Sequence, residues 1–417
     1  MVLRIATAGS VDDGKSTLIG RLLHDSKSVF EDQLRSVERD SRRYGDGSAN
    51  LALLTDGLRA EREQGITIDV AYRYFATPAR TFVVADTPGH AQYTRNMVTG
   101  ASVSDLAIVL VDARVGMTEQ TQRHLLVASL LGIPRAVLAV NKMDLVGFDE
   151  DVFRSVVSSV RNHAANLPFG MDIEPIPISA LLGDNVVEAS KQMPWHDGRV
   201  LLEFLEGVDS GSNPDIGARL AVQWVSRPYA REHHDFRGIS GRLSGGPLKV
   251  GDQVVVLPSR LRSRVTSIRL GGRWVDEVDG GRSICIEIAD DVDVGRGDVV
   301  VVAEAPKQPE VSDRLVADVC WMVERTLQPG TRWLLKHGTK TVRAIVDAVS
   351  GRYDIGTGAL GPADHLALND LGRLDLQTTA PLVFDAYDVH RRGGSGILID
   401  ESSGMTAGAV MIRGGVR

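Results

Sequence analysis

A glycine-rich run near the start of the chain has the residue types and spacing of a phosphate-binding loop. It reads Gly9-Ser10-Val11-Asp12-Asp13-Gly14-Lys15-Ser16-Thr17 and fits the pattern G-x-x-x-x-G-K-[ST]. Glycines let backbone N–H groups converge on phosphate oxygens, the lysine can reach the β and γ phosphates, and the serine hydroxyl can bind Mg²⁺. The alternative, a glycine-rich turn with an exposed lysine, is disfavoured because an apolar strand-like run precedes the loop. The pattern predicts a site for a nucleoside triphosphate.

A second motif indicates which base is bound. Asn141-Lys142-Met143-Asp144 follows an apolar run, at the end of a strand where open α/β sheets bind ligands. A carboxylate at Asp144 can accept from the N1–H and N2–H₂ donors of guanine, whereas adenine would leave it buried and unpaired. By itself N-K-x-D also fits an ordinary turn. Because Ser179-Ala180-Leu181 follows the next apolar run and supplies backbone donors for guanine O6, we predict that the base is guanine.

The run Asp86-Thr87-Pro88-Gly89-His90 provides the residue types of a nucleotide switch. We expect Asp86 to contact the Mg²⁺ shell through water and the Gly89 N–H to sense a γ-phosphate. His90 then stands beside the attacking water as the residue that orients it, and this role is favoured over the alternative of a surface histidine at a helix start. Upstream, Thr67 can be the second protein ligand of Mg²⁺ after Ser16. Together these segments predict two loops that are ordered by GTP and Mg²⁺ and that loosen on hydrolysis to GDP.

Other candidate groups are weaker. His233 and His234, beside Glu232 and Asp235, resemble metal ligands, but adjacent loop residues seldom face one ion, so we expect a solvated loop. Val11 and Ile66 could form an apolar gate in front of His90, and core packing explains them equally well. The basic run 260–264 has no interleaved aromatic residues, so an exposed loop and strand start is expected there rather than an RNA platform.

Length, charge and cysteine content limit the class of protein. The 417 residues predict two or three domains, and 47 Lys+Arg against 54 Asp+Glu give a net charge of −7, which argues against a broad DNA-binding surface. Cys285 and Cys320 are too few for a disulfide framework, and we expect them to be buried small hydrophobic residues in a cytoplasmic protein. We expect no export signal at the N-terminus and no transmembrane segment, since the longest apolar region, 125–140, is interrupted by Gly132, Pro134 and Arg135.

The elements that must position these motifs change in character along the chain. Up to residue 206, apolar runs alternate with helical stretches, which is typical of a mostly parallel sheet with helices on both faces. The runs are 3–8, 81–85, 106–112, 136–141 and 176–178. Beyond a polar, glycine-rich stretch the pattern becomes short strands separated by glycines, typical of antiparallel barrels. The expected strands there are 220–225, 248–257 with a turn at Gly251-Asp252, 283–288, 315–322, 332–337, 341–347, 374–379 and 396–400.

The expected fold class is therefore an α/β P-loop GTPase domain followed by two antiparallel β-barrel domains. We predict a GTP-binding domain at 1–206, a linker at 207–217, a second domain at 218–304, a linker at 305–310 and a third domain at 311–417. The sequence contains neither low-complexity tracts nor internal repeats.

The motifs and domain order resemble the translational GTPases related to elongation factor Tu. Within this superfamily, residues 9–23, 56–75, 85–97, 235–238 and 256–259 are similar to the GTPase subunit of the two-subunit bacterial sulfate adenylyltransferase (ATP sulfurylase). Elongation factors usually place histidine where this chain has Ser10. The longer polar loop around 232–234 is a departure from some relatives.

The resemblance implies a GTPase that forms a heterodimer, or an assembly of heterodimers, with a smaller adenylyltransferase subunit. That partner transfers AMP from ATP to sulfate, giving adenosine 5′-phosphosulfate and diphosphate, while this chain hydrolyses GTP. Some relatives carry a fused kinase, which we do not expect here because a second phosphate-loop pattern is absent. Two alternatives stay open, a factor that delivers aminoacyl-tRNA to ribosomes and a free-standing GTPase, since one scaffold serves several functions.

Overall fold

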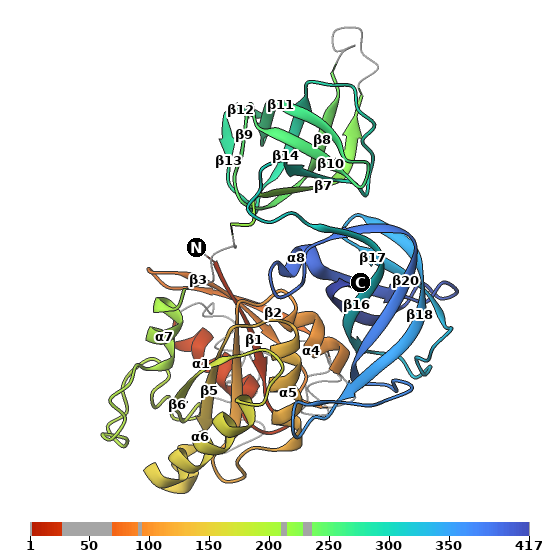
Figure 1. Cartoon of the computed structure of the whole chain (residues 1–417). Coiled ribbons are helices and arrows are strands. Elements are labelled where there is room, and N and C mark those ends of the chain that lie inside the picture. Colours follow the sequence, from red (N-terminus) through yellow and green to blue (C-terminus); the bar gives the residue numbers. More distant parts are fainter. Residues whose placement is uncertain (1, 27–68, 91–93, 210–214, 228–235, 417) are drawn as a thin grey trace. The chain divides into compact units, whose positions relative to one another are not determined.

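The computed structural model describes residues 2–26, 69–90, 94–209, 215–227 and 236–416 (Figure 1). Thr67, Ile66 and the segment 232–235 singled out above lie outside these ranges. The chain divides into two compact units, one of Met1–Gly211 with Tyr353–Ala359 and one of Ser212–Arg352 with Leu360–Arg417.

The first unit is built on a six-stranded sheet with the order β2-β3-β1-β4-β5-β6. Its strands are β1 (Val2–Ala8), β2 (Ala71–Ala76), β3 (Thr81–Asp86), β4 (Leu106–Asp112), β5 (Arg135–Asn141) and β6 (Asp172–Pro177). All neighbours pair in parallel except β2 and β3. Every residue of β4 is buried, as a central parallel strand covered on both faces requires.

Helices cover both faces of this sheet (Figure 1). Among the described residues of this unit, the helices are α1 (Lys15–Asp25), α4 (Thr94–Ala101), α5 (Glu119–Leu130), α6 (Glu150–Ala164), α7 (Leu201–Gly207) and the 3₁₀ turn η3 (Met143–Val146). In right-handed crossovers, the direction in which the chain moves along the sheet decides which face the helix covers. The connections through α4, α5 and α6 all move towards β6, so these helices lie on one face, whereas the connection through α1 moves the other way and places α1 on the other face. The helices α1 and α7 share one buried cluster with the sheet, which includes Leu18, Leu22 and Leu205.

Two closed antiparallel barrels make up the second unit. The first barrel has the order β10-β15-β7-β8-β14-β11-β12 and is closed by pairing of β10 with β11. Its strands, with a separate pair formed by β9 and β13, are β7 (Ala218–Ser226), β8 (Gly238–Gly245), β9 (Leu248–Lys249), β10 (Gln253–Leu257), β11 (Leu261–Leu270), β12 (Arg273–Val275), β13 (Glu277–Val278), β14 (Ser283–Ile288) and β15 (Val299–Val302).

The other barrel has the order β17-β21-β22-β16-β20-β18-β19 and is closed by β17 and β18. Its elements are β16 (Glu310–Trp321), β17 (Arg332–His337), β18 (Lys340–Tyr353), β19 (Leu360–Gly361), β20 (Leu371–Phe384), α8 (Arg391–Gly394), β21 (Ser395–Ile399) and β22 (Thr406–Gly415). Trp321 and Trp333 meet edge to face in its core, with ring centroids 4.9 Å apart.

This architecture confirms the predicted fold class. The run 248–257 forms two strands, β9 and β10, with a turn between them, and they pair with other strands rather than with each other. The expected strand 176–178 is part of a longer strand, β6, which begins at Asp172. Among the described residues, no helix combines the length and the apolar character that crossing a membrane would need.

Candidate functional site

The phosphate-loop pattern lies between β1 and α1, where the sequence places it. Gly9 and Gly14 have φ values of 152° and 92°, which favour glycine, and Asp12 also has a positive φ of 68°. Gly14 is the N-cap of α1 and offers no side-chain acceptor, so the first-turn N–H groups of this helix have no side-chain cap. Uncapped N–H groups at the positive end of a helix are suited to hold phosphate oxygens.

Lys15 lies buried inside this loop. Its side chain is 7% exposed, and Nζ donates to the carbonyl oxygens of Gly9 at 2.9 Å and Ser10 at 2.7 Å. Burial lowers the pKa of the Lys15 ammonium, and the charges of Asp86 and Asp13 oppose that shift. The ammonium is thus held at the centre of the loop, next to the uncapped start of α1.

The Asp86–His90 motif lies against the same loop. A Cβ on Gly89 would overlap Lys15 Nζ and come within 2.6 Å of the Gly9 carbonyl oxygen, so only glycine allows this approach. Asp86 is buried at the end of β3, and Thr87 donates its hydroxyl proton to the Thr7 carbonyl. His90 is exposed. The structure therefore brings together the two segments that the sequence predicts on either side of the γ-phosphate.

Asn141 connects the phosphate loop to the predicted base loop. Its Nδ2 donates to the Asp13 carbonyl at 2.7 Å, and its Oδ1 accepts from the Ala180 N–H at 2.9 Å. Asn141 is buried, so its amide holds two loops in register rather than facing an open cavity. The sequence predicts Asn141 as a nucleotide-binding residue, and the structure shows that its side chain links these two loops.

Asp144 and Lys142 follow β5 in different environments. Asp144 lies in η3, half-buried, and its carboxylate accepts no hydrogen bond within the described part of the chain. Lys142, with a φ of 63°, places Nζ 2.9 Å from Asp112 Oδ2. Burial alone would raise the pKa of Asp112, but hydrogen bonds from Arg114 and Lys142 outweigh it and hold that pKa well below its usual value. Asp112 therefore stays ionised and orients Lys142.

Three side chains that the sequence analysis did not identify form hydrogen bonds with the phosphate loop or with the loop 179–181. His124 in α5 accepts the Gly9 N–H at Nδ1, 3.0 Å away, and Thr118, the N-cap of α5, places Oγ1 2.8 Å from Ser10 Oγ. Arg21 in α1 donates to the carbonyls of Ala180 and Leu181. None of these contacts has a signal in motif spacing, because the partners are distant in the sequence.

His124 is neutral in the folded chain. It is 1% exposed, and burial lowers its pKa from 6.5 to about 3. With Nδ1 accepting from Gly9, the ring proton sits on Nε2, so the Gln120 amide, 2.9 Å away, should present its oxygen there.

Replacement of His124 by asparagine is expected to weaken the acid sensitivity of this unit. As the pH falls, the imidazole of the unfolded chain is protonated at a higher pH than that of the folded chain. The contribution of His124 to the free energy of unfolding is therefore fully present above about pH 6.5, and it falls by ~1.4 kcal/mol per pH unit as the pH drops towards the pKa of the folded chain. His124→Asn keeps an acceptor for Gly9 but cannot be protonated. Urea unfolding of both chains, followed through the transition that GDP shifts, should show the difference, and parallel pH curves would contradict it.

The burial of the remaining predicted residues differs from one position to the next. Ser16 and Thr17 are half-buried in the first turn of α1, Val11 is exposed, and Met143 and Ser179 are buried. Cys285 is half-buried and Cys320 is buried, both as free thiols. Burial raises the pKa of Cys320 to about 12, which suits the inert role expected of it. Among the described residues, clusters of His, Cys, Asp and Glu that could hold a metal by themselves are absent.

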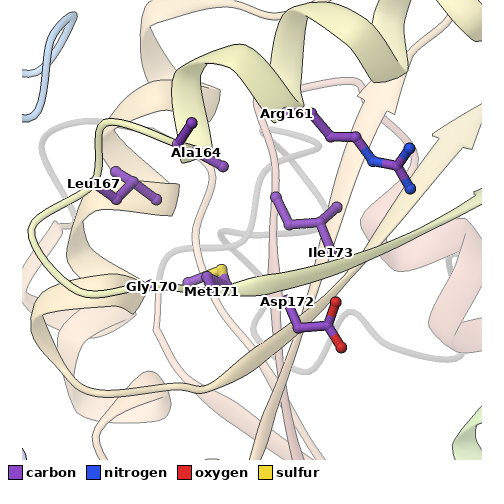
Figure 2. A pocket seen from close by; sticks show the side chains of 8 residues that line it. Arg161, Ala164, Leu167, Gly170, Met171, Asp172 and Ile173 are labelled. Carbon is purple, nitrogen blue, oxygen red and sulfur yellow. The ribbon is translucent and has the colours of Figure 1, made fainter.

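A surface pocket of about 360 Å³ lies elsewhere on the first unit (Figure 2). It is formed by the end of α6 and the start of β6, with Arg161 and Asp172 among its lining residues. Asp172 pairs with the first residue of β5, whereas Asn141 is the last residue of that strand. The pocket therefore lies at the amino ends of the strands, whereas the predicted nucleotide site lies at their carboxyl ends.

Comparison with known proteins finds family models and relatives that match most of the chain. The elongation factor Tu GTP binding domain model matches residues 1–213, and the GTP-eEF1A C-terminal domain-like model matches 314–413. The chain is 50% identical to the bifunctional enzyme CysN/CysC of Mycobacterium tuberculosis over 99% of its length and 67% of that protein. It is 49% identical to sulfate adenylyltransferase subunit 1 of Shewanella oneidensis and to that of Methylorubrum populi, covering 99% of this chain and 86% and 87% of those proteins.

Proposed function

Since this chain belongs to the sulfate adenylyltransferase subunit 1 family, whose GTPase domain is of the elongation factor Tu type, we propose that it is the GTP-hydrolysing subunit of a sulfate adenylyltransferase. The observation that carries the proposal is the identity of about half over 99% of the chain, which includes both barrels as well as the nucleotide motifs. The proposed partner is the smaller adenylyltransferase subunit. The two free thiols fit a reducing cytoplasm.

The phosphate loop and α1 are proposed to bind the triphosphate. The uncapped N–H groups of the first turn of α1 would take the phosphate oxygens, and Lys15 would neutralise charge on the β and γ phosphates. Because Lys15 is already buried between main-chain carbonyls, the ammonium needs little rearrangement to do this. The loop is thus preorganised for an anion.

Mg²⁺ fits the oxygen donors available beside the loop. Ser16 presents a hydroxyl at the start of α1, and Asp86 presents a buried carboxylate near the Lys15 charge. Hydroxyl and carboxylate oxygens are ligands that Mg²⁺ prefers, with Asp86 acting through water and Thr67 as a further ligand. When bound, Mg²⁺ would withdraw charge from the β and γ phosphates.

The base site is proposed to select guanine through one carboxylate and one backbone amide. Asp144 has a carboxylate whose acceptor capacity is unused by the described residues, so it can take the N1–H and N2–H₂ protons. The loop Ser179–Leu181 is held at the end of β5 by the Asn141 amide and is proposed to supply the backbone donor for O6. An adenine base would leave Asp144 without a partner, and that desolvation cost provides the selectivity.

Coupling to the partner follows from the energetics of the proposed reaction. Joining sulfate to AMP forms a phosphoric–sulfuric anhydride, which is strongly uphill, so GTP hydrolysis by this chain would supply the driving force. That coupling requires the GTP and GDP states to contact the partner differently.

The proposal predicts that GTP hydrolysis by the purified chain rises only when the smaller subunit, ATP and sulfate are present together. Adenosine 5′-phosphosulfate should accumulate in step with GDP, which can be followed by chromatography of both products. Omission of sulfate is the matched control. A rate that ignores all three additions but responds to ribosomes and aminoacyl-tRNA would favour the delivery factor instead, and a rate that ignores everything would favour a free-standing GTPase.

A further inference from the structure

Arg21 joins the helix that carries the phosphate-binding residues to the loop that faces the base. It lies about one and a half turns along α1 from Lys15 and Ser16, and its side chain is 19% exposed. Nε donates to the Ala180 carbonyl at 3.2 Å, and Nη2 donates to the Leu181 carbonyl. One guanidinium therefore holds two consecutive peptide groups, a use of its rigid fork of donors that a lysine cannot reproduce.

Holding these carbonyls also orients an N–H group. In a trans peptide the C=O of one residue and the N–H of the next lie in one plane and point in opposite directions. The bond from Arg21 to the Ala180 carbonyl thus turns the Leu181 N–H away from α1. The side chain of Arg21 fixes the direction of a donor that it does not touch.

The Leu181 N–H is the donor left over in this loop. The Ala180 N–H is used by Asn141 Oδ1, and the Leu182 N–H donates to Ser179 Oγ at 3.2 Å. Within the described part of the chain, the Leu181 N–H has no acceptor, and Leu181 is 58% exposed. A main-chain donor without a protein partner, held in a fixed direction in the loop that Asn141 ties to the end of β5, is suited to a carbonyl oxygen on a ligand.

We infer that Arg21 is a positioning residue for guanine recognition, which aims the Leu181 N–H at O6 of the base. This inference rests on the proposed base site and deepens it, because it separates recognition of O6 from recognition of N1 and N2 by Asp144. Arg21 contacts neither base nor phosphate in this account. Its removal should therefore weaken one hydrogen bond to the base and leave the others.

The test compares three nucleotides on the intact chain and on Arg21→Ala. GTP has every contact, 6-thio-GTP replaces O6 by sulfur, a weaker acceptor, and ITP lacks the N2 amino group that Asp144 would accept from. We expect Arg21→Ala to lower GTP affinity by roughly tenfold, as for one hydrogen bond to an exposed loop. The GTP to 6-thio-GTP affinity ratio should fall towards one, while the GTP to ITP ratio stays at the value of the unaltered chain. Equilibrium binding by calorimetry measures all three.

Two control variants separate this role from a structural one. Arg154→Ala removes an arginine that, like Arg21, makes an i,i+4 ion pair on a helix of the same unit, and it should change neither ratio. Arg21→Lys keeps the charge, so an intermediate GTP to 6-thio-GTP ratio is expected, and this variant also serves if Arg21→Ala fails to fold.

Each outcome is decisive. An equal fall in both ratios, or an equal loss for all three nucleotides, would overturn the inference and assign Arg21 to folding of the loop. Unchanged affinities would overturn it as well. If the unaltered chain itself shows no preference for GTP over 6-thio-GTP and ITP, the proposed base site fails, which is a different result from failure of Arg21 alone.

Discussion

Asp144→Asn is expected to change the preferred base from guanine to xanthine. The carboxylate of Asp144 would accept two protons from guanine, whereas an asparagine amide can donate to the O2 carbonyl that xanthine has in place of the amino group. A site built around hydrogen bonds rejects an unmatched base strongly, so the affinity ratio of GTP to XTP should swing by roughly 10⁴-fold.

The surroundings of Asp144 explain why so large an effect is expected from one atom. Asp144 lies half-buried in η3 directly after β5, and its carboxylate has no hydrogen-bond donor among the described residues. The Arg114 guanidinium interacts electrostatically with Asp144, but its Nε and Nη2 already donate to the Asp112 carboxylate at 3.0 and 2.6 Å. With GTP present, the asparagine variant would leave the base donors unmatched.

Competition binding of GTP against XTP measures this swing. The matched control is Asp151→Asn, which makes the same chemical change at an exposed position in the first turn of α6. Binding of XTP by Asp144→Asn would itself show that the variant is folded. A variant that still prefers GTP would count against the assignment of Asp144 to the base.

His90→Ala is expected to slow GTP hydrolysis by roughly 10²-fold or more while leaving GTP affinity nearly unchanged. Gly89 lies so close to Lys15 and the Gly9 carbonyl that a side chain there is excluded. The next residue, His90, is exposed, and we expect the attacking water to lie beside it. A group that orients only this water contributes to the rate and not to ground-state binding.

Single-turnover hydrolysis and equilibrium binding, measured on the same preparation, separate the two effects. His90→Gln should retain part of the rate because an amide can also orient water. His365→Ala removes another exposed histidine, from the second unit, and should change neither quantity. Losses of affinity and rate by the same factor would remove His90 from the water-orienting role.

Much of the first unit could be predicted from the sequence. The runs 106–112 and 136–141 are apolar except for their last residues, Asp112 and Asn141, which is a local signal, and the structure confirms them as β4 and as β5 with one added residue. The phosphate loop is similarly local, because its glycines and its lysine belong to one turn between a strand and a helix. The run 248–257 shows the limit, since the alternation predicts strands but the pairing of β9 with β13 depends on a distant segment.

By itself, then, the sequence determined that the chain carries the motifs of a GTP-binding domain, because those signals lie within short segments, and it predicted which residues surround the triphosphate and the base. Only the tertiary structure decided how the segments are held together. Asn141 reaches Asp13 across 128 residues, His124 reaches Gly9 across 115, and Arg21 reaches Ala180 across 159. Spacing along a chain carries no information about such contacts, since a buried amide, imidazole or guanidinium finds its acceptor only when the sheet and helices have packed.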